Sequence, residues 1–131
     1  MSRLTERIDT FNKVYTLYCS MRNAYLTEIN NMTKLALIHS FELVIEFSLK
    51  FLKEYLGKTN IKVYTPLKVI KKALTKNIIK NEQIWLDMIK YKNLTFLECN
   101  SATTNQILEK ISSSYFIELK NFYESLEVII K

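Results

Sequence analysis

The sequence is poor in residues that make turns and bind metals: its 131 residues include one Gly, one Pro, one His and two Cys. β-Sandwiches and barrels need a turn residue about every 8–12 positions, so this composition argues against an all-β fold. One glycine cannot build a Gly-rich phosphate loop, which argues against nucleotide-hydrolysing and nucleotidyl-transferring enzymes of that type. One histidine leaves no candidates to spare for a His metal site or a Ser-His-Asp triad. We therefore expect no metal, no cofactor and no catalytic residue.

Long uncharged apolar runs are also missing. The most apolar stretch, residues 35–52, is interrupted by four charged or titratable side chains, whereas a membrane-spanning helix needs about 20 nearly uncharged residues. The first residues lack the apolar segment of a signal peptide. These features predict a cytoplasmic protein that does not enter a membrane, with Cys19 and Cys99 as reduced thiols.

Hydrophobic residues make up 48% of the sequence, and they are spaced with the periodicity of helices. Apolar side chains recur three, four or seven positions apart, as on one face of a helix. Thr33, Thr65 and Asn81 are expected N-caps, and Gly57 is expected to end a helix in the left-handed conformation. The predicted helices span residues 4–29, 33–56, 65–78, 81–91 and 102–129. This pattern predicts an all-α fold: a single domain over residues 1–131, built as an up-and-down four-helix bundle with an additional short helix.

The predicted helix over residues 33–56 is apolar around most of its circumference. Such a helix lies either in the centre of a bundle or at a subunit contact. On it, Glu42 and Glu46 stand four residues apart, where each carboxylate needs a partner or a polar cleft. Lys50 stands one turn further and can pair with Glu46, which is the structural alternative to a cleft. His39, one turn before them, is expected to be structural.

The positive charge is concentrated in one region. Residues 50–80 contain nine lysines and one acid, a local charge of +8 against +6 for the whole chain. Four of these lysines lie on neighbouring positions of one predicted helix: Lys68, Lys71, Lys72 and Lys76. They form a candidate surface for an anion, RNA or an acidic partner, although solvated lysines alone would give the same pattern.

A second candidate cluster lies at the end of the predicted helix over residues 81–91. Asp87, Lys92, Asn93 and Thr95 bring hydrogen-bonding groups together and can line a polar cleft. In the alternative interpretation, Trp85 and its neighbour Met88 fill the core and the polar residues only hold the loop.

These segments, in this order and spacing, resemble the nucleotidyltransferase substrate-binding protein family of the HEPN superfamily. The resemblance rests on Phe41-Glu42, Glu46, the run from Lys50 to Leu56, Thr65-Pro66, Trp85-Leu86-Asp87-Met88 and Asn93-Leu94-Thr95. It implies a helical bundle that forms a homodimer and pairs with a separately encoded minimal nucleotidyltransferase. It also implies a substrate or nucleotide cleft, with Glu42, Glu46, Asp87, Lys92, Asn93 and Thr95 as its residues.

Three positions depart from the family pattern. Many members carry Arg-Asn-x-x-x-His, the signature of HEPN ribonucleases, whereas this sequence has Lys92 at the Arg position and Leu97 at the His position. The third is Cys99, which stands where many members have a Tyr two residues after the His. Leucine cannot transfer a proton, and lysine lacks the fork that holds a phosphate in fixed geometry. The leading hypothesis is therefore a non-catalytic accessory subunit. The alternatives are a ribonuclease toxin of a toxin–antitoxin pair, silenced by a nucleotidyltransferase antitoxin, and a helical protein-interaction module.

Overall fold

A computed structural model describes residues 3–58, 65–92 and 101–129. All of the regular structure in these three ranges is α-helical, which confirms the predicted all-α class. The helices are α1 (Arg3–Thr27), α2 (Asn31–Lys58), α3 (Pro66–Thr75), α4 (Glu82–Lys92), α5 (Ala102–Ser112) and α6 (Ser114–Ile129).

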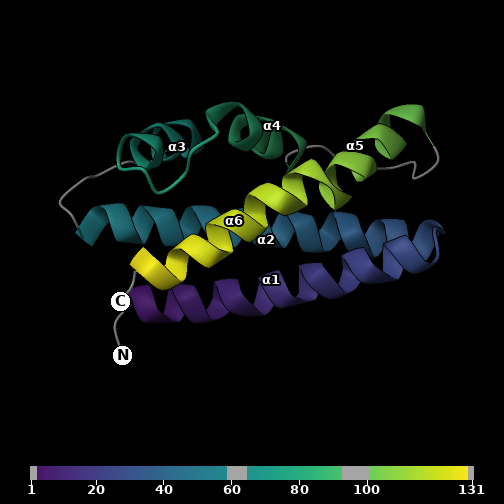
Figure 1. Ribbon diagram of the computed structural model, residues 1–131, viewed down its shortest axis with the longest axis horizontal. Helices are drawn as coiled ribbons and strands as arrows, with labels where there is room; N and C mark the ends of the chain where they lie inside the picture. Colours follow the sequence, from purple (N-terminus) through teal and green to yellow (C-terminus); the bar gives the residue numbers. More distant parts are fainter. Residues whose placement is uncertain (1–2, 59–64, 93–100, 130–131) are drawn as a thin grey trace.

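Helices α1 and α2 form a long antiparallel hairpin, and α6 runs obliquely across it (Figure 1). Helices α3 and α4 lie on the side of α2 away from α1. Helix α2 contacts α1, α3, α4 and α5, so most of its apolar side chains are covered within the chain, while Met32 and Leu35 at its start are exposed. The sequence predicted that this helix lies either in the centre of a bundle or at a subunit contact, and the structure places it in the centre of the bundle.

An aromatic cluster holds the layers together. Phe122 of α6 meets Phe11 of α1, Phe51 of α2 and Trp85 of α4 edge to face, with ring centroids 5.5, 6.2 and 5.2 Å away. All four rings are buried. Edge-to-face pairs add to the free energy gained by removing the rings from water. One residue of α6 thus packs against three other helices.

Two of the predicted helix starts are confirmed by side-chain caps. The Lys68 amide donates to Thr65 Oγ1 at 3.3 Å, and the Ile84 amide donates to Asn81 Oδ1 at 3.1 Å. The predicted cap at Thr33 was wrong by three residues. Asn30 is the cap, and Thr33 completes a reciprocal pair, in which each side chain accepts from the other residue's amide at 2.9 and 3.0 Å.

The predicted left-handed residue was also misplaced. Gly57 lies inside α2, which continues to Lys58, and its φ is not positive. The left-handed residue is Asn77, with φ of 60°, just after α3. The Ile78 amide there donates to the Ala73 carbonyl at 2.9 Å, a closing bond of the kind made after a left-handed helix end. Asparagine is among the few residues other than glycine that tolerate this conformation.

The predicted single helix over residues 102–129 is broken at Ser113, where φ is −124° and ψ is −89°. Three serines, residues 112–114, occupy the break, and the hydroxyls of Ser112 and Ser113 both donate to the Glu109 carbonyl. Serine side chains compete in this way with the backbone ladder of a helix. Two side chains of α1 satisfy carbonyls at the break: the Tyr18 hydroxyl donates to Ile111, and Arg22 Nε donates to Ser112 at 2.6 Å.

We expect Tyr18→Phe to lower the free energy of unfolding by about 1–3 kcal/mol, because the buried Ile111 carbonyl would lose its donor while the ring stays in place. Chemical denaturation followed by circular dichroism measures the loss. Tyr123→Phe removes a tyrosine hydroxyl from a less buried ring and serves as the control. An equal effect of the two substitutions would contradict the role given to the break.

Candidate functional site

The first candidate site lies where α2, α4 and α6 meet. Glu42 of α2 is half-buried, and burial raises the pKa of its carboxyl group above the ordinary value. Electrostatic interactions with His39 and Lys92 lower this pKa and partly oppose the effect of burial. Lys92 of α4 thus influences the carboxyl group of Glu42 on α2, and both are among the predicted residues.

Asp87 contributes to the same region from α4. Its Oδ1 accepts a hydrogen bond from Gln83 Nε2 at 2.9 Å. Its negative charge acts on the hydroxyl of Tyr115, whose pKa is raised to about 12, mainly by burial. The Tyr115 ring stacks on Phe41, the neighbour of Glu42, with centroids 5.8 Å apart. Through Tyr115, the Asp87 side of α4 is connected to the Glu42 side of α2.

The Tyr115 hydroxyl is the unusual group of this region. The side chain is 2% exposed, and its oxygen is buried without a hydrogen-bond partner among the described residues. A buried hydroxyl without a partner costs about 1–3 kcal/mol. Like any tyrosine hydroxyl, it is protonated at neutral pH and can therefore donate a hydrogen bond. We call Glu42, Asp87, Lys92 and Tyr115 the tyrosine site.

The other predicted cleft residues are placed differently. Glu46 forms an ion pair with Lys50 at 3.8 Å along α2, as the structural alternative predicted. Trp85 and Met88 are fully buried in the core, as the alternative for that cluster predicted. Asn93 and Thr95 lie outside the described residues, as do Leu97 and Cys99; Cys19 is a free thiol.

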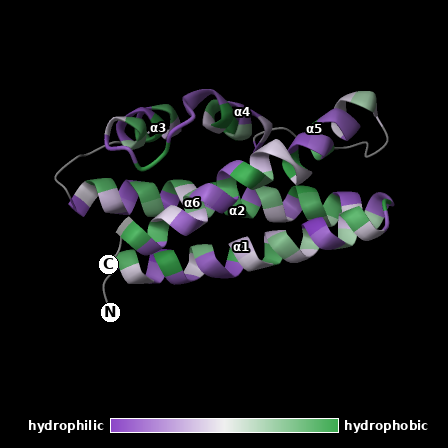
Figure 2. Cartoon of the chain, in the orientation of Figure 1, coloured by the Kyte–Doolittle hydropathy of each residue, from purple (hydrophilic) through white to green (hydrophobic). Residues whose placement is uncertain are grey.

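The predicted lysine surface forms the outer side of α3 and its end. Lys68, Lys71, Lys72 and Lys76 are all exposed, while Val69, Ile70 and Ala73 on the opposite side of α3 are buried. Figure 2 shows hydrophilic residues along α3 and its connection to α4. Neither of the two ion pairs found among the described residues involves these four lysines. We call them the lysine face.

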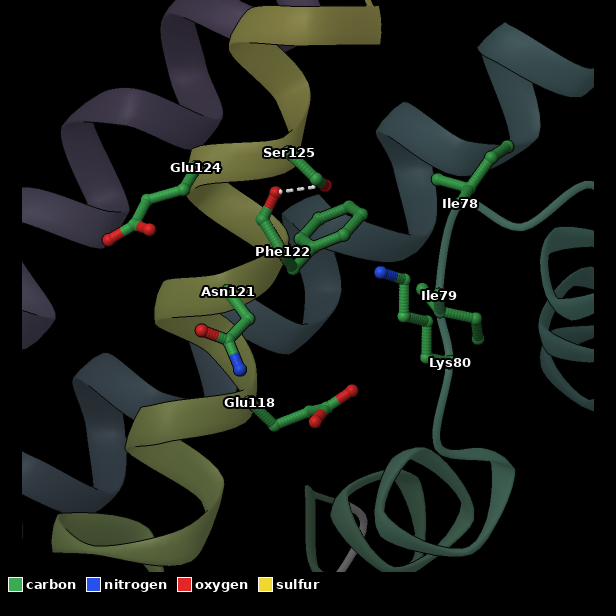
Figure 3. A pocket seen from close by; sticks show the side chains of 8 residues that line it. All are labelled: Ile78, Ile79, Lys80, Glu118, Asn121, Phe122, Glu124 and Ser125. Carbon is green, nitrogen blue, oxygen red and sulfur yellow. Dashed lines mark hydrogen bonds between the residues drawn. The ribbon is translucent and has the colours of Figure 1, made fainter.

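The structure contains a cleft that the sequence did not predict. It lies between α6 and the segment 78–80 that joins α3 to α4, and has a volume of about 270 Å³ (Figure 3). Ile78, Ile79 and Phe122 form its apolar wall, and Lys80, Glu118 and Asn121 contribute polar groups. The signal that could have found it is Glu118, a carboxylate between Tyr115, Leu119 and Phe122 on the buried stripe of α6.

Within residues 3–58, 65–92 and 101–129, no cluster of three or more His, Cys, Asp or Glu side chains is arranged to hold a metal ion. In the same ranges, no helix combines the length and the apolar character that crossing a membrane requires.

In class, the protein is an all-α helical bundle with polar side chains gathered at its helix junctions. The particular family follows from a sequence comparison. A family model described as "nucleotidyltransferase substrate binding protein like" matches residues 2–128, so the chain belongs to this family. The family description gives a role in substrate binding for nucleotidyltransferases. No curated protein matches the sequence.

The tyrosine site leads to a prediction on pH. A folded-state pKa above the ordinary 4.5 means that ionised Glu42 destabilises the fold at neutral pH, and that this cost disappears as the pH falls through the raised pKa. We therefore expect Glu42→Gln to raise the melting temperature at pH 7 and to leave it unchanged near pH 4. Thermal unfolding across this pH range measures the difference. Glu127→Gln, at an exposed position of α6, is the control; a Glu42→Gln variant less stable than the wild type at pH 7 would contradict the prediction.

Proposed function

We propose that this chain is a non-catalytic accessory subunit that binds a substrate or nucleotide for a separately encoded minimal nucleotidyltransferase. Family membership supports the substrate-binding role. The sequence supports the division of labour, because its one glycine, Gly57, is followed by Lys58, and these 131 residues therefore contain no Gly-Ser motif of the nucleotidyltransferase type. In this arrangement, the helical bundle holds the substrate and its partner performs the transfer.

The observation that carries the proposal is the buried hydroxyl of Tyr115, which has no hydrogen-bond partner among the described residues and is influenced by the charge of Asp87. A bound ligand with an acceptor oxygen would take a hydrogen bond from Tyr115 and a charge interaction from Lys92. Hydroxyl or amine donors of the same ligand would bond to Glu42 and Asp87. The tyrosine site thus offers donors and acceptors suited to a polar substrate, and Glu46, Asn93 and Thr95 join it in the proposal through the family resemblance.

The direct test is co-purification. A tagged full chain is recovered from its host, and the proteins bound to it are identified by mass spectrometry. We expect a small protein carrying a Gly-Ser motif and paired aspartates of the nucleotidyltransferase type. A chain that recovers no such protein, and binds none when co-expressed with the nucleotidyltransferase of its own host, would refute the proposal.

The proposal includes a homodimer. Exposed apolar side chains gather at the end of the α1–α2 hairpin: Leu26, Ile29, Met32 and Leu35. The reciprocal cap between Asn30 and Thr33 fixes the backbone there. Apolar patches of this kind mark interfaces when they are contiguous.

We expect light scattering at micromolar concentration to give the mass of a dimer, and Met32→Glu to shift it toward that of a monomer, because a charge would have to be buried in the contact. The control is Ile117→Glu, at an exposed apolar position of α6. A wild-type monomer, or a dimer unaffected by Met32→Glu, would contradict this placement of the contact.

A further inference from the structure

The cleft between α6 and the segment 78–80 has a fixed apolar wall and lies apart from the residues of the tyrosine site. Ile78, Ile79 and Phe122, which form the wall, are each at most 6% exposed and belong to the core. The turn before the wall is held by a backbone hydrogen bond from the Ile78 amide to the Ala73 carbonyl. The volume of about 270 Å³ lies just below the range of about 300–1,000 Å³ usual for small-molecule pockets. The cleft therefore has room for a small ligand with a compact apolar body.

The charges that line this cleft are negative in sum. Glu118 and Glu124 of α6 contribute two carboxylates, against one ammonium group from Lys80. Lys80 is exposed, and neither of the two ion pairs found among the described residues involves it or either carboxylate. The lysine face does not line the cleft, and salt screens its exposed charges over about 8–10 Å. The lining therefore favours a cation over an anion.

Glu118 is the carboxylate that is best placed to meet a ligand. Figure 3 shows its side chain extending from α6 toward the segment 78–80, whereas Glu124 extends to the other side of α6. The Trp85 indole donates to Glu118 Oε1 at 3.1 Å and so orients the carboxylate. Burial raises the pKa of the half-buried Glu118 carboxyl group above its ordinary value, although the bond from Trp85 lowers it. A neutral indole does not balance the charge of this carboxylate, whereas a cation in the cleft would.

Other polar groups of the cleft can also accept hydrogen bonds. The Ser125 hydroxyl donates its proton to the Phe122 carbonyl at 2.7 Å, so its oxygen is available to a ligand as an acceptor (Figure 3). The Asn121 amide can accept as well as donate. A protonated primary amine carries several N–H donors, and its hydrogen bonds to a carboxylate are strong because they are charge-assisted. Such a group matches the acceptors that this side of the cleft offers.

We propose that this cleft binds a small primary amine with a compact apolar body. The ammonium group lies at Glu118, and the apolar body lies against Ile78, Ile79 and Phe122. Glu124, at the rim, attracts the cation over a longer distance, and Lys80 opposes it. This inference goes beyond the proposed function, because it concerns a different cleft and needs no partner protein.

The experiment titrates the full chain with phenethylamine and with two compounds of similar body: the neutral 2-phenylethanol and the anionic 3-phenylpropionate. Binding is followed by NMR of the backbone amides and by calorimetry. We expect phenethylamine to bind most tightly and 3-phenylpropionate most weakly, because only the charge and donors of the polar group differ substantially. The amides of residues 78–80 and 118–125 should shift. This comparison uses the wild-type chain, so it does not depend on how well a variant folds.

Two substitutions in the cleft should act in opposite directions. Glu118→Gln should weaken phenethylamine binding about tenfold or more, because it keeps an acceptor for Trp85 but removes the charge that pairs with the amine. Lys80→Gln should strengthen the binding about twofold, because it removes an exposed like charge. The matched controls are Glu127→Gln and Lys120→Gln, at exposed positions of α6 outside the cleft, and both should bind like the wild type.

Three results would overturn the proposal. The first is no binding at millimolar phenethylamine, and the second is binding no tighter than that of 2-phenylethanol. The third is an equal loss for Glu118→Gln and Glu127→Gln, which would show that the net charge of the chain attracts the amine. Since the chain is tested alone, these outcomes do not depend on whether a nucleotidyltransferase partner is found.

Discussion

Phe122→Ala should lower the free energy of unfolding by about 3–5 kcal/mol, because it removes a buried ring and leaves a cavity among three other aromatic rings. Phe122 meets Phe11, Phe51 and Trp85 edge to face, so the loss affects contacts with α1, α2 and α4 together. A domain is typically stable by about 5–15 kcal/mol, so this loss is a large share of the total stability. Urea denaturation followed by circular dichroism measures the effect.

Two further variants calibrate this result. Phe122→Leu keeps most of the apolar contact area and should lose less than Phe122→Ala, which allows a measurement even where the alanine variant is largely unfolded. Ile117→Ala, at an exposed position of the same helix, should change stability by about 0.5 kcal/mol or less. A small loss for Phe122→Ala, comparable with that of Ile117→Ala, would show that Phe122 does not hold the layers together.

The second large effect concerns the lysine face. If this face meets an acidic surface of the nucleotidyltransferase, the combined variant Lys68→Glu, Lys72→Glu and Lys76→Glu should weaken the complex by about 100-fold or more. Like charges facing each other across an interface cost several kcal/mol, and each 1.4 kcal/mol corresponds to a factor of ten. The three residues are exposed, so the fold should be unaffected. Affinity is measured by calorimetry on the purified pair.

The control changes net charge equally at three exposed lysines elsewhere: Lys13, Lys58 and Lys120. We expect this second variant to bind the partner with less than a tenfold loss. An equal loss for the two variants would mean that net charge, and not the lysine face, controls association. Full binding by the first variant, with loss of RNA binding instead, would assign the face to RNA.

Many of the features that depend on neighbouring residues were predictable, although the cap of α2 and the left-handed residue were misplaced. The stripe of Phe11, Tyr15 and Tyr18 is buried as its spacing indicated, and the caps at Thr65 and Asn81 form because each side chain bonds to an amide three residues away. The break at Ser113 was not predictable in the same way. It is stabilised by Tyr18 and Arg22, about 90 residues earlier in the sequence, and periodicity carries no information on such contacts.

The same distinction applies to the candidate sites. Glu42 could be identified from the sequence because a carboxylate among apolar residues of one helix is recognisable from its neighbours alone. The structure places Glu42 in a half-buried position. Glu118 has the same signature on α6, but it lies outside residues 41–95, the part of the sequence that carries the family resemblance. Its bond to Trp85 joins residues 33 positions apart, and the cleft next to it forms only when α6 packs against the segment 78–80.

The bond between Trp85 and Glu118 has a practical consequence. Trp85 is the chain's single tryptophan, so all indole emission of the protein comes from one position. Its ring nitrogen donates a hydrogen bond to Glu118, a carboxylate that lines the cleft between α6 and the segment 78–80. A molecule that binds in this cleft and changes the charge or the hydration of Glu118 therefore changes the electric field at the indole. Intrinsic fluorescence therefore provides a label-free optical probe of occupancy, usable in screening libraries of small molecules without any modification of the protein.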